Sequence, residues 1–374
     1  MNIKPVSLLS HIGSTTTRFA FFAAVLAIGL LPIILSSTAY ASPIKAAFIL
    51  VGPADHVGWS YSHNQGRLAI ERTFGDKVET EVVEFVPEGR SSREVLQDLA
   101  DRNDIVFATS FGYMVSTESI ARDNPNVIFE HATGSRQGGN LGNYATRAYQ
   151  PRYLSGLIAG SMTKNGKIGY VAAHPIPEVI RGINAFTMGV REVNPTAEVE
   201  VLWTYKWYDP EKDVELANQL IESGVDLLTH HTDSSAIAEI AEQKNVYVIG
   251  YHSDMRPFAP SKHLASVVHN WGPYYINRIQ ALLNNTWKPD SEWTGMAEST
   301  SQLVSISPEI PADIRRLVAN KQQEIMSGQY SVFAGPIKSY RGSTRIKEGK
   351  ELSDDQLLRM NWYVEGVTGS LLAF

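Results

Sequence analysis

The sequence predicts an α/β protein made of two doubly wound, Rossmann-like lobes that face each other across a cleft and are joined by several hinge strands. Short apolar runs alternate with segments of helical periodicity along most of the chain. This alternation is typical of parallel sheets that are covered by helices on both faces. The pattern restarts near residue 150, and a tail from residue 302 adds further elements. The restart favours two α/β units over one long sheet, and the tail indicates that the chain crosses between them more than once.

The first half of the chain contains four strand patterns separated by three helical patterns. The opening run at 44–51 is apolar, which is typical of a buried strand. Ser91 or Ser92 is a suitable N-cap for the second helix, and Glu94 lies in its first turn. The strands are expected at 44–51, 82–86, 104–108 and 127–129, and the helices at 62–74, 91–99 and 116–122.

The second half repeats the alternation with longer helices. Asp209 is an expected N-cap, Pro210 an expected first helical residue and Gly224 the expected end of that helix. Further helices are expected at 151–163, 177–193, 235–243 and 273–283. Strands are expected at 167–172, 198–203, 225–228, 246–249 and 264–268. In the tail, strands are expected at 304–306 and 332–334, and a helix at 311–326.

The first 41 residues have the features of a secretory signal peptide. Lys4 and Arg18 are basic, 19–35 is apolar, and Ala39-Tyr40-Ala41 is an A-x-A cleavage signature. We expect cleavage after about Ala41 and a periplasmic mature protein. An uncleaved membrane anchor is the alternative, because the apolar run is nearly as long as a span.

The remaining chain is long enough for two domains of ordinary size. Lobe 1 is expected to comprise 44–147 and about 271–301, and lobe 2 to comprise 148–270 and about 302–374. The sequence contains no cysteine, which rules out disulfides and lipid attachment to a lipobox cysteine.

Charge and missing motifs exclude several classes of function. The formal net charge is −6, and loss of the two basic residues of the signal would make it −8. An acidic chain without a Lys/Arg cluster is poorly suited to nucleic acid or to an anionic membrane surface. Motifs for an α/β-hydrolase, a zinc protease, a dinucleotide site and a P-loop are absent. We therefore predict no catalytic residue, metal or cofactor. The glycine-rich segment 134–142 is interpreted as a connection where the chain changes lobe, in preference to a phosphate-binding loop.

Two tryptophans are the strongest functional signal. Trp59 lies in a GWSY segment and Trp207 in a YKWYD segment, each in a polar, aromatic turn between a strand and a helix. Ligands of open α/β sheets bind at such carboxyl-end turns. Two rings held at the surface, one from each lobe, can close on a flat ligand from both sides. The alternative role for each ring is a lid over the core.

A second polar group follows two neighbouring strand patterns. The segment His230-His231-Thr232-Asp233 comes after one strand, and His252-Ser253-Asp254 after the next. Both are expected at the same sheet edge. They can provide hydrogen bonds to a ligand or, alternatively, an acid–base or metal site. Hydrogen bonding is favoured because the chain shows neither a nucleophile signature nor a carboxylate-rich metal pattern.

The order and spacing of several short segments extend over nearly the whole mature chain. These are GWSY with Gln65-Gly66, SFGY at 110–113, YLSG at 153–156, GKIG at 166–169, Asn194-Pro195, GVD at 224–226 and Ile249-Gly250. In these segments the chain resembles the basic membrane protein (BMP) family of ABC-transporter substrate-binding proteins, which includes purine-nucleoside receptors. The resemblance implies a type I periplasmic binding protein fold, hinge closure around a ligand, a permease partner in the inner membrane and a monomer.

The resemblance also implies a ligand. In the nucleoside receptors two aromatic residues sandwich the purine, at the positions of Trp59 and Trp207, and a segment matching 111–113 lines the cleft. Their ribose-holding acid and lysine fall on His252 and on His269 or Asn270. Because both charges are missing here, we expect a free purine base, adenine in particular. The expected ligand-binding residues are Trp59, Ser60, Gly112, Tyr113, Trp207, Asp233, His252, Asp254, His269 and Trp271.

Alternatives from other classes remain open at this stage. One is a receptor for a nucleoside, a pyrimidine, a flavin or a sugar, with polar clamps for a sugar at Asn64, Arg67, Arg136 and Arg181. Another is an exported enzyme that uses the His/Asp group. A third is a sensor that signals to a membrane kinase.

Overall fold

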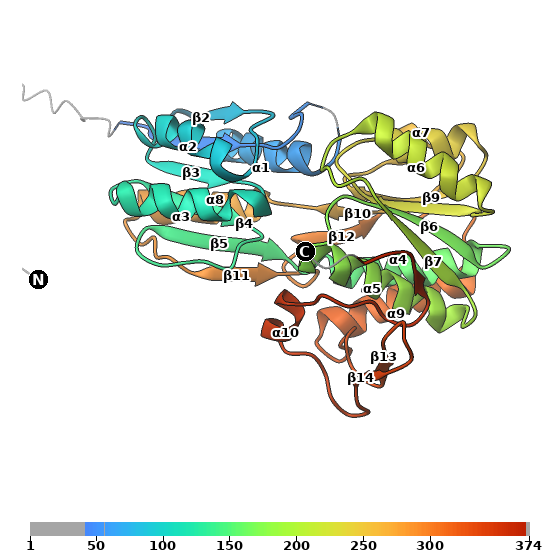
Figure 1. The fold of residues 1–374 in the computed structure, drawn as a ribbon. Helices are drawn as coiled ribbons and strands as arrows, with labels where there is room; N and C mark the ends of the chain where they lie inside the picture. The colour runs from blue at the N-terminus through green and yellow to red at the C-terminus, as the bar shows by residue number, and fades with distance from the viewer. Residues whose placement is uncertain (1–41, 56, 372–374) are drawn as a thin grey trace, which may run out of the picture. The chain divides into compact units, whose positions relative to one another are not determined.

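The computed structural model describes residues 42–55 and 57–371, which belong to one compact unit (Figure 1). The signal peptide expected at 1–41 lies outside the described residues, as do positions 56 and 372–374. Within the described ranges, no helix is both long and apolar enough to cross a membrane.

The first sheet has six parallel strands in the order β11-β5-β4-β3-β1-β2. Alternate residues of β1 face opposite helical layers, as expected for a sheet covered on both sides. Ala46 and Phe48 pack with α1 and α8, whereas Ala47 and Ile49 pack with α2 and α3. The strands are β1 (Ile44–Ile49), β2 (Val78–Val83), β3 (Ile105–Ala108), β4 (Ile128–Ala132), β5 (Leu141–Thr146) and β11 (Ser291–Thr294). The helices are α1 (Trp59–Phe74), α2 (Ser92–Ala100), α3 (Met114–Asp123) and α8 (Gly272–Leu283).

The second sheet has seven strands in the order β12-β10-β9-β8-β6-β7-β15, and only β12 is antiparallel to its neighbour. Its strands are β6 (Lys167–Ala172), β7 (Glu198–Trp203), β8 (Leu227–His231), β9 (Tyr247–His252), β10 (His263–His269), β12 (Ser301–Val304) and β15 (Val367–Thr368). The helices α6 (Pro210–Glu222) and α7 (Ala236–Gln243) share one core. On the other face α4 (Tyr149–Met162) and α5 (Pro177–Val193) pack so closely that a Cβ at Gly156 would lie 2.1 Å from a backbone oxygen of α5.

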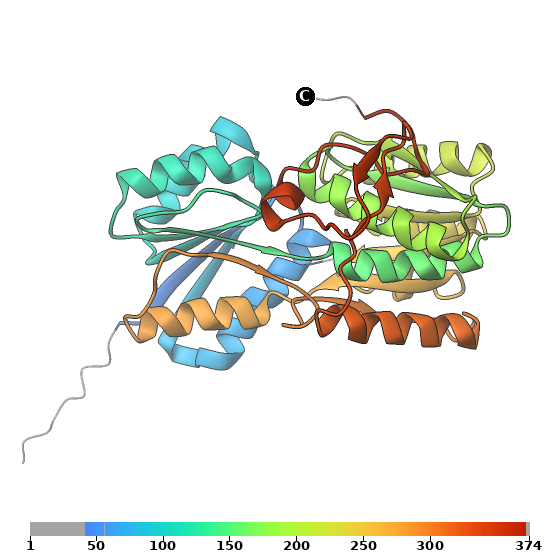
Figure 2. The same ribbon diagram turned by 90° about the horizontal axis from the view of Figure 1, so that it is seen from below.

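The tail packs on the outer side of α4 and α5 (Figure 2). It contains α9 (Ala312–Met326), the small hairpin of β13 (Ile337–Lys338) and β14 (Thr344–Ile346), and α10 (Asp354–Leu358). Single 3₁₀ turns occur at Gly75–Lys77, Gly89–Ser91, Phe111–Tyr113 and Arg256–Phe258.

The described chain passes between the two sheets at three places: after β5, after β10 and after β11. At the first two, Thr146 Oγ1 and His269 Nδ1 lie 3.1 Å apart. These connections agree with the order expected for two lobes joined by several segments. The exact lobe boundaries stay a prediction. A lobe is defined by the segments that move together, and one structure shows a single arrangement of them.

Some local predictions are wrong. The segment 134–142 does not change lobe, because it joins β4 to its neighbour β5 within one sheet. The polar LGNYAT sequence of β5 lacks the apolar run by which strands were recognised. The strand expected at 82–86 ends earlier, before Phe85 with its positive φ of 54°. The strand expected at 332–334 is a turn with one isolated bridge at Ala334.

Candidate ligand-binding site

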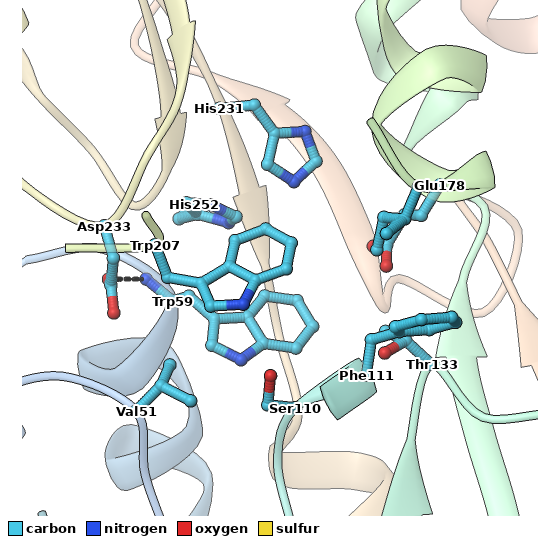
Figure 3. A pocket seen from close by; sticks show the side chains of 11 residues that line it. Val51, Trp59, Ser110, Phe111, Thr133, Glu178, Trp207, His231, Asp233 and His252 are labelled. Carbon is cyan, nitrogen blue, oxygen red and sulfur yellow. Dashed lines mark hydrogen bonds between the residues drawn. The ribbon is translucent and has the colours of Figure 1, made fainter. Parts of the chain in front are cut away.

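A cavity with about 20 Å³ of free space for water-sized molecules lies where the carboxyl ends of the two sheets meet (Figure 3). Its lining comes from both lobes and is made up of Val51, Trp59, Ser110, Phe111, Thr133, Ile176, Glu178, Trp207, His231, Asp233 and His252. Since a buried water needs about 10–15 Å³ of such space, the cavity is narrow in this arrangement of the lobes.

Trp59 is the first residue of α1 and is only 9% exposed, so the prediction of a ring held at the surface of a turn is wrong for this residue. Its indole Nε1 donates a hydrogen bond of 2.6 Å to the carbonyl oxygen of Thr109, just after β3. His252 packs edge-to-face against the indole, with ring centroids 5.5 Å apart. The ring is therefore held rigidly at the border between the core and the cavity.

Trp207 lies in the turn after β7 and is half-buried. Its Nε1 donates a 3.0 Å hydrogen bond to Glu88 Oε1, which belongs to the other lobe. His174 lies edge-on to the indole, with centroids 4.8 Å apart. In Figure 3 the two indoles overlap in projection, and His231, Glu178 and Ser110 are arranged around their edges.

Asp233 joins the two lobes. Its Oδ1 accepts hydrogen bonds from the backbone N–H groups of Trp59 and Ser60, and its Oδ2 accepts one of 2.7 Å from Ser60 Oγ. Ser253 Oγ accepts another, of 2.8 Å, from the backbone N–H of Gly58. We call these contacts the interlobe cap, because lobe 2 satisfies the N–H groups that the first turn of α1 leaves free. The lobes are therefore closed on each other in this structure.

The histidines lie within the last positions of their strands, not after them. His231 ends β8 and His252 ends β9; both line the cavity and are 2% exposed. Within the described part of the chain, Nδ1 of each ring has no hydrogen-bond partner. Burial holds the pKa of both rings well below the ordinary value, with a smaller contribution from neighbouring cations and histidines. Each ring is therefore neutral at pH 7 and offers one donor and one acceptor nitrogen.

Four of the predicted ligand-binding residues line the cavity: Trp59, Trp207, Asp233 and His252. The other six are not part of the lining and bind protein groups. Ser60 contacts Asp233, Gly112 N donates to Glu88, and Tyr113 OH donates to Val86 O; Asp254 accepts from Ser305, His269 contacts Thr146, and Trp271 donates to Ser62.

Several lining residues were not in the predicted set. Phe111 belongs to the cleft segment that the family resemblance indicated, although only its neighbours Gly112 and Tyr113 were selected. Glu178 follows Pro177 in the first turn of α5, where an acidic residue is favoured by the helix dipole alone. Nothing in the local sequence distinguishes it from an ordinary helix start.

The charges around the cavity are few. Glu178 and Asp233 are its acidic residues, and neither Lys nor Arg lines it. Arg152 lies behind it, with its guanidinium carbon 3.7 Å from the Tyr251 ring centroid and Nη1 donating to Thr229. In the described ranges, no cluster of three or more His, Cys, Asp or Glu could hold a metal ion. The lining is suited to a flat ligand without a phosphate group.

Comparison with known proteins identifies the family. The family model for PnrA-like ABC transporter substrate-binding proteins matches residues 44–333. A purine-binding protein of Brucella abortus is 42% identical over 331 residues, covering 88% of this chain and 94% of that protein. The chain belongs to the PnrA-like family of ABC-transporter substrate-binding proteins. A putative ABC transporter glucose-binding protein of Haloferax volcanii is 36% identical over 329 residues, covering 88% of this chain and 81% of that protein.

Solved structures show the same fold for this substrate-binding protein. A solute-binding protein of Aeropyrum pernix K1 aligns with a TM-score of 0.69 at 18% identity, covering 84% of this chain and 95% of that one. A solute-binding protein of Conexibacter woesei aligns with a TM-score of 0.62 at 20% identity, covering 77% and 98%. The predicted type I periplasmic binding protein fold and the predicted family are both confirmed.

Membership in this family defines the general role. Its members are substrate-binding proteins and not enzymes; each binds a small molecule and works with a transporter permease. Such proteins are typically extracytoplasmic.

Proposed function

We propose that this substrate-binding protein captures a free purine base, adenine in particular, between Trp59 and Trp207 and delivers it to an ABC permease of the inner membrane. The observation that carries the proposal is that two indoles from opposite lobes line one cavity with polar groups around their edges. An indole face suits a heteroaromatic ring, and base–aromatic stacking contributes about 1–3 kcal/mol per base. The 42% identity to a purine-binding protein supports the same ligand class.

The lobes exchange hydrogen bonds through the interlobe cap and through Trp207 and Glu88. A ligand stacked on one indole would bring the other lobe over its second face, so that closure depends on contacts made only in the closed state. The proposal places the mature protein in the periplasm as a monomer, without a lipid anchor because the sequence has no cysteine.

The absence of ribose-holding charges favours a base over a nucleoside. The resemblance places an acid at His252 and a lysine at His269 or Asn270, and burial lowers the pKa of both imidazole rings so that they are neutral. Two neutral imidazoles are poor substitutes for an ion pair that holds sugar hydroxyls.

A sugar is the second candidate, because one relative at 36% identity is described as glucose-binding. The polar residues that could clamp a sugar do not line the cavity. Arg67 pairs with Glu71, Arg136 pairs with Glu118, and Arg181 donates to the Leu357 carbonyl oxygen. These three arginines are therefore not available as clamps for a sugar in the cavity.

Calorimetric titration of refolded, ligand-free protein with adenine, guanine, hypoxanthine, adenosine and glucose tests the proposal. We expect adenine to bind most tightly and adenosine at least about tenfold more weakly, which corresponds to about 1.4 kcal/mol. Mass spectrometry of small molecules released by denaturing the protein from its native host should recover the same base. Preference for adenosine would contradict the free-base assignment. Binding of glucose without any purine would replace the proposal with the sugar receptor.

A further inference from the structure

The two acidic residues of the cavity differ in what they contact. The oxygens of Asp233 accept hydrogen bonds from Trp59 and Ser60 in the interlobe cap. The carboxyl group of Glu178 accepts or donates no hydrogen bond among the residues that the structure describes. Figure 3 shows it directed from the first turn of α5 into the cavity, on the side bounded by Phe111. Glu178 is thus the acid whose hydrogen-bonding capacity is available to a ligand.

The cation nearest to Glu178 along its helix does not neutralise it by direct contact. Arg181 is one turn further along α5, and its guanidinium donates to the Leu357 carbonyl oxygen at 2.8 Å. It also lies over the Trp293 ring, 4.8 Å from the centroid. Burial raises the pKa of Glu178 to about 7, and Arg181 opposes this rise only in part. Glu178 is half-buried and its carboxyl group has no hydrogen-bond partner among the described residues, so a ligand that pairs with it is favoured.

We propose that the Glu178 side chain, directed into the cavity, reads the edge of the bound base by a pair of hydrogen bonds to a ring nitrogen and the adjacent amino group. The inference rests on the proposed function and names the residue that selects among purines. A protonated carboxyl group presents one O–H donor beside one acceptor oxygen. The same side-by-side pattern in Asn and Gln recognises adenine in nucleic acids. An edge with two neighbouring N–H donors, as in guanine, would instead require the ionised carboxylate.

Other titratable groups border this part of the cavity. They are Arg181 on the same helix, His174 before it, His231 and His252 at the ends of β8 and β9, Asp233 after β8, and Arg152 and Glu88 behind the lining. Burial lowers the pKa of His174, His231 and His252, so these rings stay neutral above pH 7. Burial raises the pKa of Asp233 to about 7, but its ionisation strengthens the interlobe cap. Asp233 would therefore raise ligand affinity as the pH rises, which is the opposite sign to Glu178.

Calorimetric titration with adenine between pH 6 and pH 9 tests the inference on the wild type, Glu178→Gln and Glu178→Ala. We expect the ratio of wild-type to Glu178→Gln affinity to be constant below the pKa of free Glu178, near 7, and to fall by up to about tenfold per pH unit above it, because the contribution of Asp233 is common to both proteins. Glu178→Gln keeps the donor–acceptor pair, so it should retain the pH 6 affinity within about threefold. Glu178→Ala should bind about 10- to 100-fold more weakly at pH 6.

Glu211→Gln is a matched control, because Pro210-Glu211 begins α6 as Pro177-Glu178 begins α5, but on an exposed surface. It should leave the affinity and its pH profile unchanged. Glu178→Gln binding as weakly as Glu178→Ala, or pH profiles that stay parallel between the wild type and Glu178→Gln, would overturn the inference. If the wild type binds adenine and Glu178→Ala binds it equally well, only this inference fails. If the wild type binds no purine, the proposed function itself fails.

Discussion

Replacement of Trp207 by alanine should weaken adenine binding by about 5- to 150-fold, because stacking on one ring contributes about 1–3 kcal/mol. Trp59→Ala should have an effect of the same size, and the double substitution should approach the product of the two. Trp207→Phe and Trp59→Phe keep an aromatic face and should retain most of the affinity. Calorimetric titration gives the dissociation constants, and thermal unfolding shows whether each variant is folded.

Trp362→Ala is the matched control for these substitutions. Trp362 is a half-buried tryptophan of the tail, where its ring packs against the side chain of Arg345, away from the cavity. Its removal deletes the same side chain without touching the lining, so adenine affinity should be unchanged. A Trp207→Ala protein that stays folded and binds adenine as tightly as the wild type would refute the sandwich between the two indoles.

Gly58→Ala should prevent the lobes from closing and weaken adenine binding by about 30- to 1,000-fold. This range combines about 1–2 kcal/mol of backbone strain with about 1–2 kcal/mol for loss of the interlobe cap. A Cβ at this position would lie 2.0 Å from Asp233 Oδ1, and the backbone φ of +112° is one that side chains rarely adopt. In small-angle scattering, the Gly58→Ala protein with ligand should have a larger radius of gyration than the wild type with ligand, because the closed state of the variant is disfavoured.

Asp233→Ala separates the two contributions. Alone it should weaken adenine binding by removing the acceptor for the first turn of α1. In the Asp233→Ala background, Gly58→Ala should cost less than in the wild type, since the clash with the carboxylate is gone and the backbone strain remains. Gly75→Ala is the control, because Gly75 ends α1 with φ of +52° and a Cβ added there would meet no atom within 4 Å. Additive effects of Gly58→Ala and Asp233→Ala would contradict a shared closing contact.

Most of the fold could be predicted from local sequence. The β1, β3 and β6 runs are short, apolar and buried on both faces, so their strand character is visible without knowledge of the partners. The strand β5 carries a weaker signal. Its LGNYAT sequence is partly polar, yet most of its residues are buried by the neighbouring elements. Boundaries shifted where a positive φ ends a strand, as at Phe85.

The candidate site was predicted only in part. The position of Trp207 in a turn and the shared sheet edge of His231 and His252 follow from strand order, and these three residues do line one cavity. Glu178 was not found, because an acid in the first turn of a helix is common and nothing in the local sequence shows that it lines the cavity. Asp233 was selected as a ligand contact, and the structure shows its oxygens already bound to α1. Whether it also contacts a ligand stays a prediction.

The sequence by itself determined the two α/β units and the position of Trp207 in a turn after a strand, because hydrophobic periodicity and turn position are properties of neighbouring residues. Only the tertiary structure decided which polar groups share the cavity. Gly58 and Asp233 are far apart in the chain, yet a Cβ on one would overlap the other. Such contacts depend on how the two lobes meet, and local sequence patterns contain no information on that approach. The same approach leaves Glu178 without a hydrogen-bond partner among the described residues, while it gives Asp233 several.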